Sequence, residues 1–494
     1  MNRALRRMSV AILVMFLLLL ININYLQGFE PSSLADKPGN SRAFYAAQNS
    51  YERGSIITSD GVTIAASRTS ASQNDSIKYQ RYYPDGPMYA PVTGYDTLYS
   101  QTGIEATENS LLSGSNSALT VRNFLDLLTG KPRKGATVTL TINSRAQAAA
   151  YNALVAFGKP GAVVAIDPRT GAILALASYP SYDPNTLATH DGQKLIQVDQ
   201  ALLKDPAQPL LNRALQETSP PGSTFKIITS ATLLTQNPSV TPQTSVASPT
   251  QLTLPQTTNV LINNDGEVCG NGSGQAPLIT AFAQSCDTTF GKIGMNLGGA
   301  ALNAMAEKFG MNNPGLTIPL GVAASKYAIP PSQALTAYSA IGQFSDTVTP
   351  LQEAMFAAAI ANNGTLMRPY LVQQVTASDL STVQTTSQSV FSQPVSATVA
   401  SEVGQMMLAV VQDSDGTAFN FNSNAEGGLV IAGKTGTAQN GVNNTGLNDA
   451  AFSAFAPFSN PQIAVGVIIR GGGYGAIAAA PIAVAVIKAF LRTP

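Results

Sequence analysis

The chain has 494 residues, a length that predicts two or three domains instead of one compact core. Only 11% of the residues are charged, against about 25% in an ordinary soluble protein, and 28 basic residues balance 28 acidic ones, which argues against a nucleic-acid-binding surface. One histidine and two cysteines are too few for a His/Cys metal centre, so we expect no metal and no other cofactor. A Ser-His-Asp triad would have to use His190, which lies in a loop-like stretch. Any catalysis is therefore expected to use serine, threonine, lysine and carboxylate side chains.

The first predicted element is a hydrophobic helix near the N-terminus. Three arginines within the first seven residues precede an uncharged, mostly apolar stretch over residues 8–29. About 20 apolar residues span a bilayer, and basic flanks tend to stay cytoplasmic. The pattern predicts a cytoplasmic tail over residues 1–8, a single-pass anchor in the cell membrane over residues 9–27, and a body outside the cytoplasm. The alternative is a cleaved signal peptide with a site at residues 33–35 (Ser-Leu-Ala), but the length of the apolar stretch favours the anchor.

The next elements are short. A polar, turn-rich linker over residues 28–42 leads into a mixed region of strands and turns that extends to about residue 150. Residues 130–157 predict a strand with alternating threonine, valine and leucine, which passes into an amphipathic helix. Residues 161–178 contain two β-rich runs joined by residues 167–171, whose proline and glycine predict the turn of a β-hairpin.

Helical patterns dominate from Pro221 onward. They cover residues 225–234, 278–298, 298–310 and 350–364. Two polar stretches interrupt them, a surface excursion over residues 236–256 and an insertion over residues 380–398. Strands are predicted again at residues 427–439 and 462–472, followed by a last helix over residues 479–491. This order predicts an α+β fold with an antiparallel sheet flanked by helices.

A serine and a lysine stand three residues apart at the start of the first of these helices. A serine hydroxyl is a poor nucleophile until a neighbouring group takes its proton. At positions i and i+3 of a helix, Ser223 and Lys226 share one face. The Pro-Pro-Gly break at residues 220–222 places Ser223 at the helix start, where free N–H groups favour developing negative charge. Apolar surroundings would favour neutral Lys226 as a base, and the alternative is an ordinary N-cap serine beside an ordinary lysine.

A second motif lies near the C-terminus, where Lys434, Thr435, Gly436 and Thr437 are predicted in or beside a strand. The glycine permits close approach of another backbone, and the lysine and hydroxyl groups can hold a carboxylate. The alternative is an exposed strand end without a ligand.

Between the two motifs, Ser285, Cys286 and Asp287 lie in a helical setting. The combination of S-x-x-K, S-D-N and K-T-G is the signature of penicillin-binding proteins and serine β-lactamases. The first and third motifs are intact here and in this order, whereas the second keeps its serine but ends in aspartate.

With these motifs the chain resembles the class B penicillin-binding proteins, most of all the short penicillin-binding protein A type, which has no extra C-terminal domain. The resemblance extends over nearly the whole chain and includes residues 53–61, 102–114, 140–147, 165–185, 212–226, 349–364 and 479–483. It implies an elongated, mixed α/β pedestal or dimerisation-type domain over residues 28–150 and a transpeptidase domain over residues 151–494.

The resemblance also implies an enzyme, a D,D-transpeptidase that cross-links peptidoglycan during division or growth. Ser223 would attack the carbonyl between the two terminal D-alanines of a stem peptide and form an acyl-enzyme. Lys226 would act as the base and Ser285 as a proton relay. β-Lactams would acylate the same serine. Other implied partners are lipid-linked or nascent glycan, a glycan polymerase of the SEDS type and further division or elongation proteins.

The remaining implied roles concern substrate binding. Lys434 and Thr435, with Thr437 beyond Gly436, would hold the substrate carboxylate. Two backbone N–H groups, those of Ser223 and Thr437, would form the oxyanion hole.

Asp287 departs from this family pattern, because an asparagine is usual at its position. Aspartate offers acceptors but no amide donor, and an ionised Asp287 would favour the charged form of Lys226 and weaken it as a base. We expect a working enzyme. The alternatives are a catalytically weak scaffold of the wall-synthesis machinery and a β-lactam sensor or hydrolase, for which no motif supplies a deacylating base.

The two cysteines, Cys269 and Cys286, fit a body outside the cytoplasm. In an oxidising compartment they can form a disulfide that closes a short loop and stabilises the fold by about 3 kcal/mol. The alternative is a pair of buried thiols.

Overall fold

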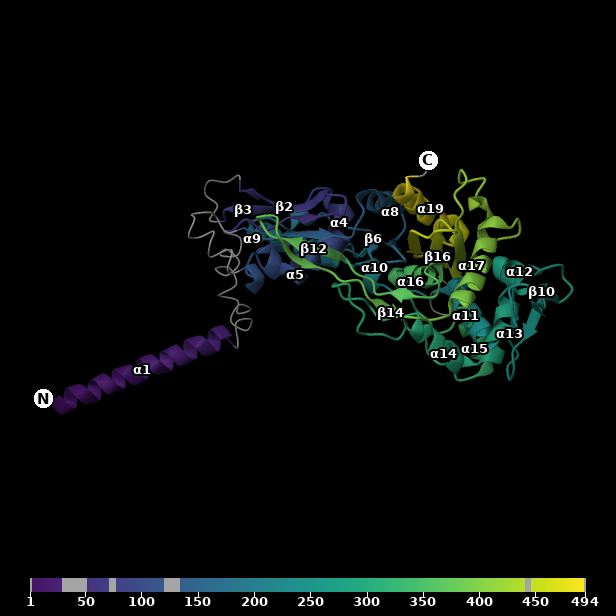
Figure 1. The fold of residues 1–494 in the computed structure, drawn as a ribbon, viewed down its shortest axis with the longest axis horizontal. Coiled ribbons are helices and arrows are strands. Elements are labelled where there is room, and N and C mark those ends of the chain that lie inside the picture. The colour runs from purple at the N-terminus through teal and green to yellow at the C-terminus, as the bar shows by residue number, and fades with distance from the viewer. Residues whose placement is uncertain (1, 29–50, 71–76, 120–133, 440–445, 493–494) are drawn as a thin grey trace.

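The computed structural model describes residues 2–28, 51–70, 77–119, 134–439 and 446–492. Apart from Gly28, the linker predicted over residues 28–42 and the alternative cleavage site lie outside the described residues. The described part forms an N-terminal helix and an elongated body with two larger sheets (Figure 1).

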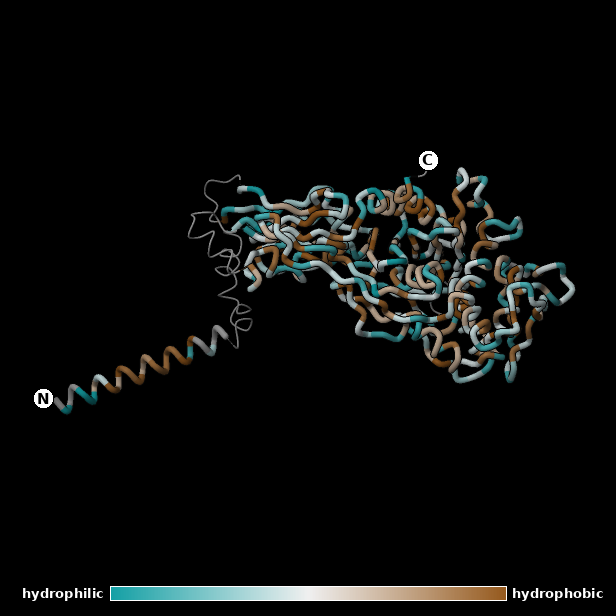
Figure 2. The backbone as a smooth tube through the Cα atoms, viewed as in Figure 1, coloured by the Kyte–Doolittle hydropathy of each residue, from teal (hydrophilic) through white to brown (hydrophobic). Residues whose placement is uncertain are grey.

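The N-terminal helix is α1 (Asn2–Gly28), which contains all of the predicted anchor. Its 18 residues Arg6–Ile23 have a mean hydropathy of 2.0, are not buried in the body, and are long and apolar enough to cross a membrane. Figure 2 shows the hydrophobic residues running along the middle of the helix.

The first sheet of the body combines segments from distant parts of the chain. Its strand order is β13-β12-β4-β1-β2-β3, with β1 and β4 parallel and the other neighbours antiparallel. The strands are β1 (Ile56–Ile57), β2 (Thr63–Thr69), β3 (Tyr79–Tyr82), β4 (Thr137–Leu140), β12 (Val372–Thr376) and β13 (Thr382–Thr385). Two strands from beyond residue 370 therefore complete a sheet that is otherwise built before residue 141.

Helices α4 (Gly86–Thr93), α5 (Gly103–Thr107) and α6 (Asn109–Leu112) accompany this sheet. From later in the chain, η1 (Pro184–Thr186) and α9 (Gly192–Lys204) follow the hairpin described below. Leu195 of α9 shares a small buried core with Ala90 and Leu98, so this later segment also packs against the N-terminal part.

A buried ion cluster holds the N-terminal part together. Glu105 of α5 is fully buried, and its two carboxylate oxygens accept hydrogen bonds from Arg53 Nε and Arg81 Nε, each at 2.6 Å. Arg81 also donates to the carbonyl of Gly54 at 2.8 Å. Burial alone would raise the pKa of Glu105, but the two arginines outweigh burial and lower it. The cluster thus ties β3, α5 and the segment before β1 into one unit.

The second sheet is antiparallel throughout, in the order β15-β16-β17-β5-β6. Its strands are β5 (Gly161–Ile166), β6 (Ile173–Tyr179), β15 (Ala432–Ala438), β16 (Asp449–Ala456) and β17 (Ile463–Ile469). The pairing of β5 with β6 confirms the predicted hairpin. In its turn, Gly171 has a φ of 82°, and a Cβ there would lie 2.3 Å from the carbonyl oxygen of Arg368, so glycine is required.

Helices cover the second sheet in two layers, which is why all residues of β5, β16 and β17 are buried. One layer is α8 (Ser144–Phe157) with α19 (Ala480–Leu491), and the other is α16 (Pro350–Ala361) with α17 (Ala397–Gln412). α8 begins where the side chain of Asn143 accepts a hydrogen bond from the N–H of Ala146 at 3.1 Å. The domain boundary expected after residue 150 falls inside this helix.

The other elements of the body are α10 (Arg213–Gln216), η2 (Gly222–Phe225), α11 (Lys226–Gln236), η3 (Asn264–Gly266), α12 (Leu278–Ala283), α13 (Asp287–Leu297), α14 (Gly299–Lys308), α15 (Gln333–Ser339), η4 (Phe419–Phe421) and α18 (Gly475–Ala478). Three two-stranded sheets are formed by β7 (Ser245–Ala247) with β10 (Gln275–Pro277), β8 (Gln251–Thr253) with β9 (Val260–Ile262), and β11 (Leu366–Met367) with β14 (Val390–Ser392).

Two predictions need correction. The helical run expected over residues 278–298 is two helices, α12 and α13, because Ser285 adopts a left-handed φ of 60° between them. The helical apolar pattern continues across this break and therefore could not reveal it. The polar stretch at residues 380–398 is also more than an insertion, because it supplies β13 and β14, whose threonine, serine and glutamine residues conceal any strand pattern.

Candidate active site

Ser223 lies in the short helix η2, directly before α11. The preceding Gly222 has a φ of 55°, and a Cβ there would lie 2.7 Å from the carbonyl oxygen of Thr437, so the turn packs directly against β15. The N–H of Gly222 donates to the carbonyl of Gly342 at 3.0 Å. The Pro-Pro-Gly break thus places Ser223 beside the strand that carries the K-T-G motif.

Lys226 is fully buried and its Nζ atom contacts three side chains. It lies 3.0 Å from Ser223 Oγ, 3.1 Å from Ser285 Oγ and 2.6 Å from Asp287 Oδ1, and it donates to the carbonyl of Ser285 at 2.7 Å. Burial lowers the pKa of Lys226, and the carboxylate of Asp287 offsets only part of this effect. A neutral Lys226 can therefore donate to Ser285 and Asp287 and still accept the proton of Ser223.

Ser285 connects the two lysines of the site. Its left-handed backbone, uncommon for a residue other than glycine, lies at the break between α12 and α13 and turns both its carbonyl and its hydroxyl toward Lys226. The same hydroxyl lies 2.9 Å from Lys434 Nζ. The break that the sequence pattern conceals is thus the feature that allows Ser285 to reach both lysines.

The K-T-G motif lies in the middle of β15. Lys434 is fully buried, and burial together with the nearby charge of Lys226 places the pKa of Lys434 well below its ordinary value. Thr435 and Thr437 lie two residues apart on the strand and both line the hollow beside Ser223. A Cβ at Gly436 would lie 2.7 Å from the carbonyl oxygen of Pro221, so the glycine allows the turn before Ser223 to approach the strand.

A hollow of about 380 Å³ is lined by Ser223, Ser285, Asp287, Thr435 and Thr437, and also by Glu267, Thr417 and Tyr474. An adjoining hollow of about 400 Å³ shares Asp287 and Thr437 with the first. Five of the predicted site residues thus line the opening, whereas Lys226 and Lys434 are fully buried and reach the site through Ser285 Oγ, which lies 3.1 Å from Lys226 Nζ and 2.9 Å from Lys434 Nζ.

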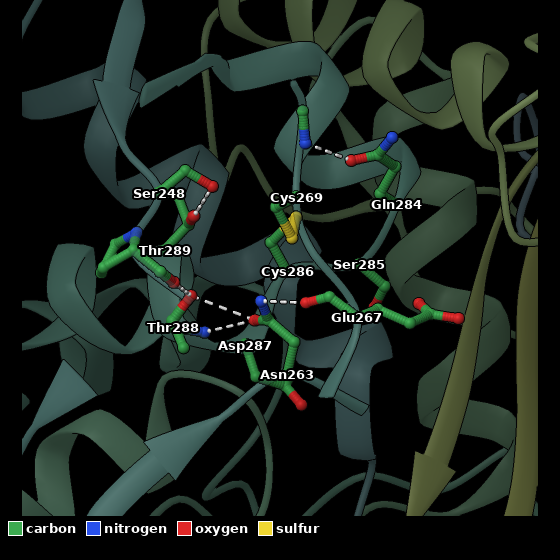
Figure 3. The surroundings of a disulfide bond; sticks show 12 residues. Ser248, Asn263, Glu267, Cys269, Gln284, Ser285, Cys286, Asp287, Thr288 and Thr289 are labelled. Atoms are coloured by element: carbon green, nitrogen blue, oxygen red, sulfur yellow. Dashed lines mark hydrogen bonds between the residues drawn. A yellow bond between two sulfur atoms is a disulfide. The ribbon is translucent and has the colours of Figure 1, made fainter. Parts of the chain in front are cut away.

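The two cysteines form a disulfide, with Cα atoms 6.1 Å apart (Figure 3). Cys286 lies between Ser285 and Asp287 in the sequence, so the bond ties the second motif to the segment that carries Glu267 on the rim of the hollow. A further bond supports this segment: the side chain of Asn263 donates to the carbonyl of Glu267 at 2.9 Å.

The sequence did not indicate two other polar contacts of the site. Thr417 Oγ1 lies 2.7 Å from Thr435 Oγ1, and Gln343 Nε2 donates to the carbonyl of Thr437 at 3.1 Å. Both residues lie in turn-rich segments outside β15: Thr417 precedes Thr435 by 18 residues and Gln343 precedes Thr437 by 94. No local pattern marks them, because their position depends on how the loops return to the strand.

Comparisons with known proteins show which families and relatives the chain is similar to. Residues 161–488 match the penicillin-binding protein transpeptidase domain, and residues 53–138 match the penicillin-binding protein A dimerisation domain. The chain is 41% identical to the peptidoglycan D,D-transpeptidase PbpA of Mycolicibacterium smegmatis over 100% of this chain and 99% of the relative. It is 39% identical to the PbpA of Mycobacterium tuberculosis, with the same coverage.

Solved structures of penicillin-binding proteins also match this chain. Penicillin-binding protein A from M. tuberculosis, in a ceftriaxone acyl-enzyme complex, matches with a TM-score of 0.84 at 38% identity, over 90% of this chain and 99% of that one. Its penicillin G acyl-enzyme complex matches with a TM-score of 0.83 at 39% identity, over 90% and 100% of the two chains. As its motifs and fold both indicate, the chain belongs to the family of penicillin-binding protein transpeptidases.

Proposed function

We propose that this chain is a peptidoglycan D,D-transpeptidase in which Ser223 is the acylated nucleophile. The observation that carries the proposal is the 3.0 Å contact between Ser223 Oγ and the Nζ atom of Lys226, a lysine that is fully buried. Relatives named as D,D-transpeptidases and solved acyl-enzyme complexes support the same chemistry.

In the first half-reaction, Ser223 Oγ attacks the carbonyl carbon between the two terminal D-alanines and its proton passes to Lys226 Nζ. The negative charge that develops on the carbonyl oxygen is stabilised by the backbone N–H groups of Ser223 and Thr437. Collapse of the intermediate breaks the C–N bond. The departing D-alanine amine takes a proton from Lys226 through Ser285 Oγ, which lies 3.1 Å from Nζ.

In the second half-reaction, an amine of a neighbouring stem attacks the ester carbon. This amine loses a proton to neutral Lys226, and Ser223 recovers a proton as the ester C–O bond breaks. The two adjoining hollows, which meet at Asp287 and Thr437, would offer space for both the acylated stem and the stem that brings the amine.

The clamp for the terminal carboxylate consists of Lys434, Thr435 and Thr437. An arriving carboxylate adds negative charge beside Lys434 and favours its protonated form, so the ligand raises the pKa of Lys434 and opposes the effect of burial.

The proposal extends to location and partners. Helix α1 would anchor the chain, with residues 1–8 in the cytoplasm and the body outside, as the arginines before the apolar stretch suggest. The part that precedes residue 150 would act as a pedestal and as the docking surface for a SEDS-type glycan polymerase or other division or elongation proteins.

The test is intact-protein mass spectrometry of the full chain in detergent after exposure to benzylpenicillin, with peptide mapping. We expect one penicilloyl group on Ser223 and none in Ser223→Ala. A folded protein that neither gains mass nor consumes the drug would contradict the proposal. Consumption of the drug without an adduct would instead indicate a hydrolase.

The Asp287 carboxylate is the specific observation that favours the second candidate, a weakly catalytic scaffold. It lies 2.6 Å from Lys226 Nζ and favours the charged lysine. Asp287→Asn removes this charge, so the pKa of Lys226 falls further and a larger fraction is neutral at pH 7.

We therefore expect the acid limb of the acylation pH–rate profile to move to lower pH in Asp287→Asn. At pH values on the acid side of the profile, the acylation rate would increase up to about tenfold for each unit by which the pKa of Lys226 falls. Unchanged profiles would show that Asp287 does not control the base. If the wild-type rate is negligible and the asparagine variant gains activity, the scaffold is the better description of this chain.

A further inference from the structure

A buried carboxyl group lies behind the nucleophile and has no part in the mechanism above. Glu353 of α16 is fully buried, and its Oε1 lies 2.7 Å from Thr224 Oγ1. Thr224 follows Ser223 directly and is also fully buried, and its Oγ1 lies 2.9 Å from the carbonyl oxygen of Pro221. The three groups form a chain across the turn that carries Ser223.

The protons of this chain can be assigned by counting donors. The Thr224 hydroxyl has one hydrogen, and the carbonyl of Pro221 can only accept. An ionised Glu353 can also only accept, so it would compete with the Pro221 carbonyl for the single hydrogen of Thr224. One of the two oxygens, Glu353 Oε1 or Pro221 O, would then face Thr224 Oγ1 without a hydrogen bond. Its Oε2 is buried and has no hydrogen-bond partner among the described residues, which disfavours a negative charge still further.

A protonated Glu353 satisfies the chain. Its hydroxyl donates to Thr224 Oγ1, and Thr224 then donates to the carbonyl of Pro221. The turn is held at the same time from its other side, because Gly222 is packed between Thr437 and Gly342. Ser223 lies between Gly222 and Thr224, so contacts on both adjacent residues hold its backbone in place.

The charged groups on the elements in contact with α16 do not oppose this state. These groups are Arg213 in α10, Asp449 in β16 and Glu402 in α17. A further charged group, Lys226, directly follows η2, the short helix that contains Thr224. None of them contributes to the pKa of Glu353, which burial raises to about 8 and which the Thr224 bond lowers only in part.

We infer that Glu353 is a positioning residue for Ser223. Its protonated carboxyl group, acting through Thr224, holds the turn that carries Ser223 in the geometry in which Ser223 Oγ contacts Lys226 Nζ. The inference rests on the proposed role of Ser223. Ionisation of Glu353 removes its donor, places a charge behind the turn and loosens the backbone that carries both Ser223 Oγ and one oxyanion-hole N–H. Acylation is therefore expected to decline at alkaline pH for a reason separate from the titration of Lys226.

The test is the acylation rate with benzylpenicillin, measured on the full chain in detergent from about pH 6 to 9.5, so that the profile spans the ionisation of a carboxyl group with a raised pKa. Three variants are compared with the wild type. Glu353→Gln keeps a donor but cannot ionise, and Glu353→Met removes the donor. Asp346→Asn is the matched control, because burial also raises the pKa of Asp346 to about 8 while its carboxylate accepts from Ser339 and does not contact the turn.

We expect the wild type and Asp346→Asn to lose at least about tenfold in rate between pH 8 and 9.5, whereas Glu353→Gln stays level over this range. Glu353→Met should be slower by at least about tenfold at pH 7, and the glutamine variant should recover most of that loss. If Glu353→Met does not fold, Thr224→Val, which removes the hydroxyl but keeps the shape, should likewise be slow and lack the alkaline decline.

The inference is overturned if Glu353→Gln keeps the alkaline decline, or if Asp346→Asn removes it. Failure of the proposed function looks different, because the wild type would then not be acylated at any pH.

Discussion

Lys226→Ala is expected to slow the acylation of Ser223 by benzylpenicillin by about 10²–10⁴-fold. The lysine is the only amine that contacts Ser223 Oγ among the described residues, and its removal leaves the hydroxyl without a group to take its proton. Lys226→Arg should fail to a similar degree, since a guanidinium keeps its charge and cannot act as a base. The measurement is the second-order acylation rate with a fluorescent or radiolabelled penicillin.

Two controls keep this prediction specific. Lys308→Ala removes an exposed lysine from α14 and should leave the rate unchanged. Because Lys226 also pairs with Asp287, the thermal transition of each variant should be recorded to show that the body remains folded. A folded Lys226→Ala protein that acylates within about tenfold of the wild type would rule out the lysine as the main base.

The largest effect on stability is expected for Glu105→Ala. The substitution leaves Arg53 and Arg81 buried, at 7% and 6% exposure, without the carboxylate that lies between them. Breaking a buried ion cluster by removing one partner costs about 3–5 kcal/mol in the free energy of unfolding. Because the folded-state pKa of Glu105 is lowered, its contribution is present above the pKa of an unfolded glutamate and is lost as the pH falls through the lowered value.

The matched control is Glu52→Ala, which breaks the surface pair with Lys134 at 2.8 Å, where the two side chains are 34% and 48% exposed. Exposed pairs contribute about 0–1 kcal/mol, so this variant should unfold close to the wild type. Urea titration followed by fluorescence and circular dichroism measures both variants. Equal midpoints for the two variants would show that the arginines find other partners when the carboxylate is gone.

The sequence was most informative where function imposes a short motif. Ser223 and Lys226, the K-T-G strand and the hairpin at residues 161–178 could all be predicted, because the chemistry or the turn requires particular residues at fixed spacing. The comparisons confirm the family and the fold that these motifs indicated.

The sequence was least informative where a contact depends on the three-dimensional path of the chain. The left-handed Ser285 lies within an unbroken helical pattern, and the bond of Thr417 to Thr435 joins a loop to a strand. Glu353 lies on a helix whose apolar residues predict burial on every side, so only the folded structure shows that its carboxyl faces Thr224. Each of these positions is determined by packing between distant segments and not by local propensity.

The pairing of β12 with β4 has a consequence for the protein as an assembly. The backbone hydrogen bonds between Val372–Thr376 and Thr137–Leu140 join a strand inside the matched transpeptidase domain to the strand at the end of the matched dimerisation domain, so the two matched domains share one sheet. A fragment that starts after β4 would expose β12 as an unpaired, aggregation-prone edge. Replacing the segment before residue 141 with that of a relative would require a strand that fits this register. A force applied to the first sheet would therefore act at once on residues of both matched domains, although the second sheet, which carries the K-T-G strand, is separate from it.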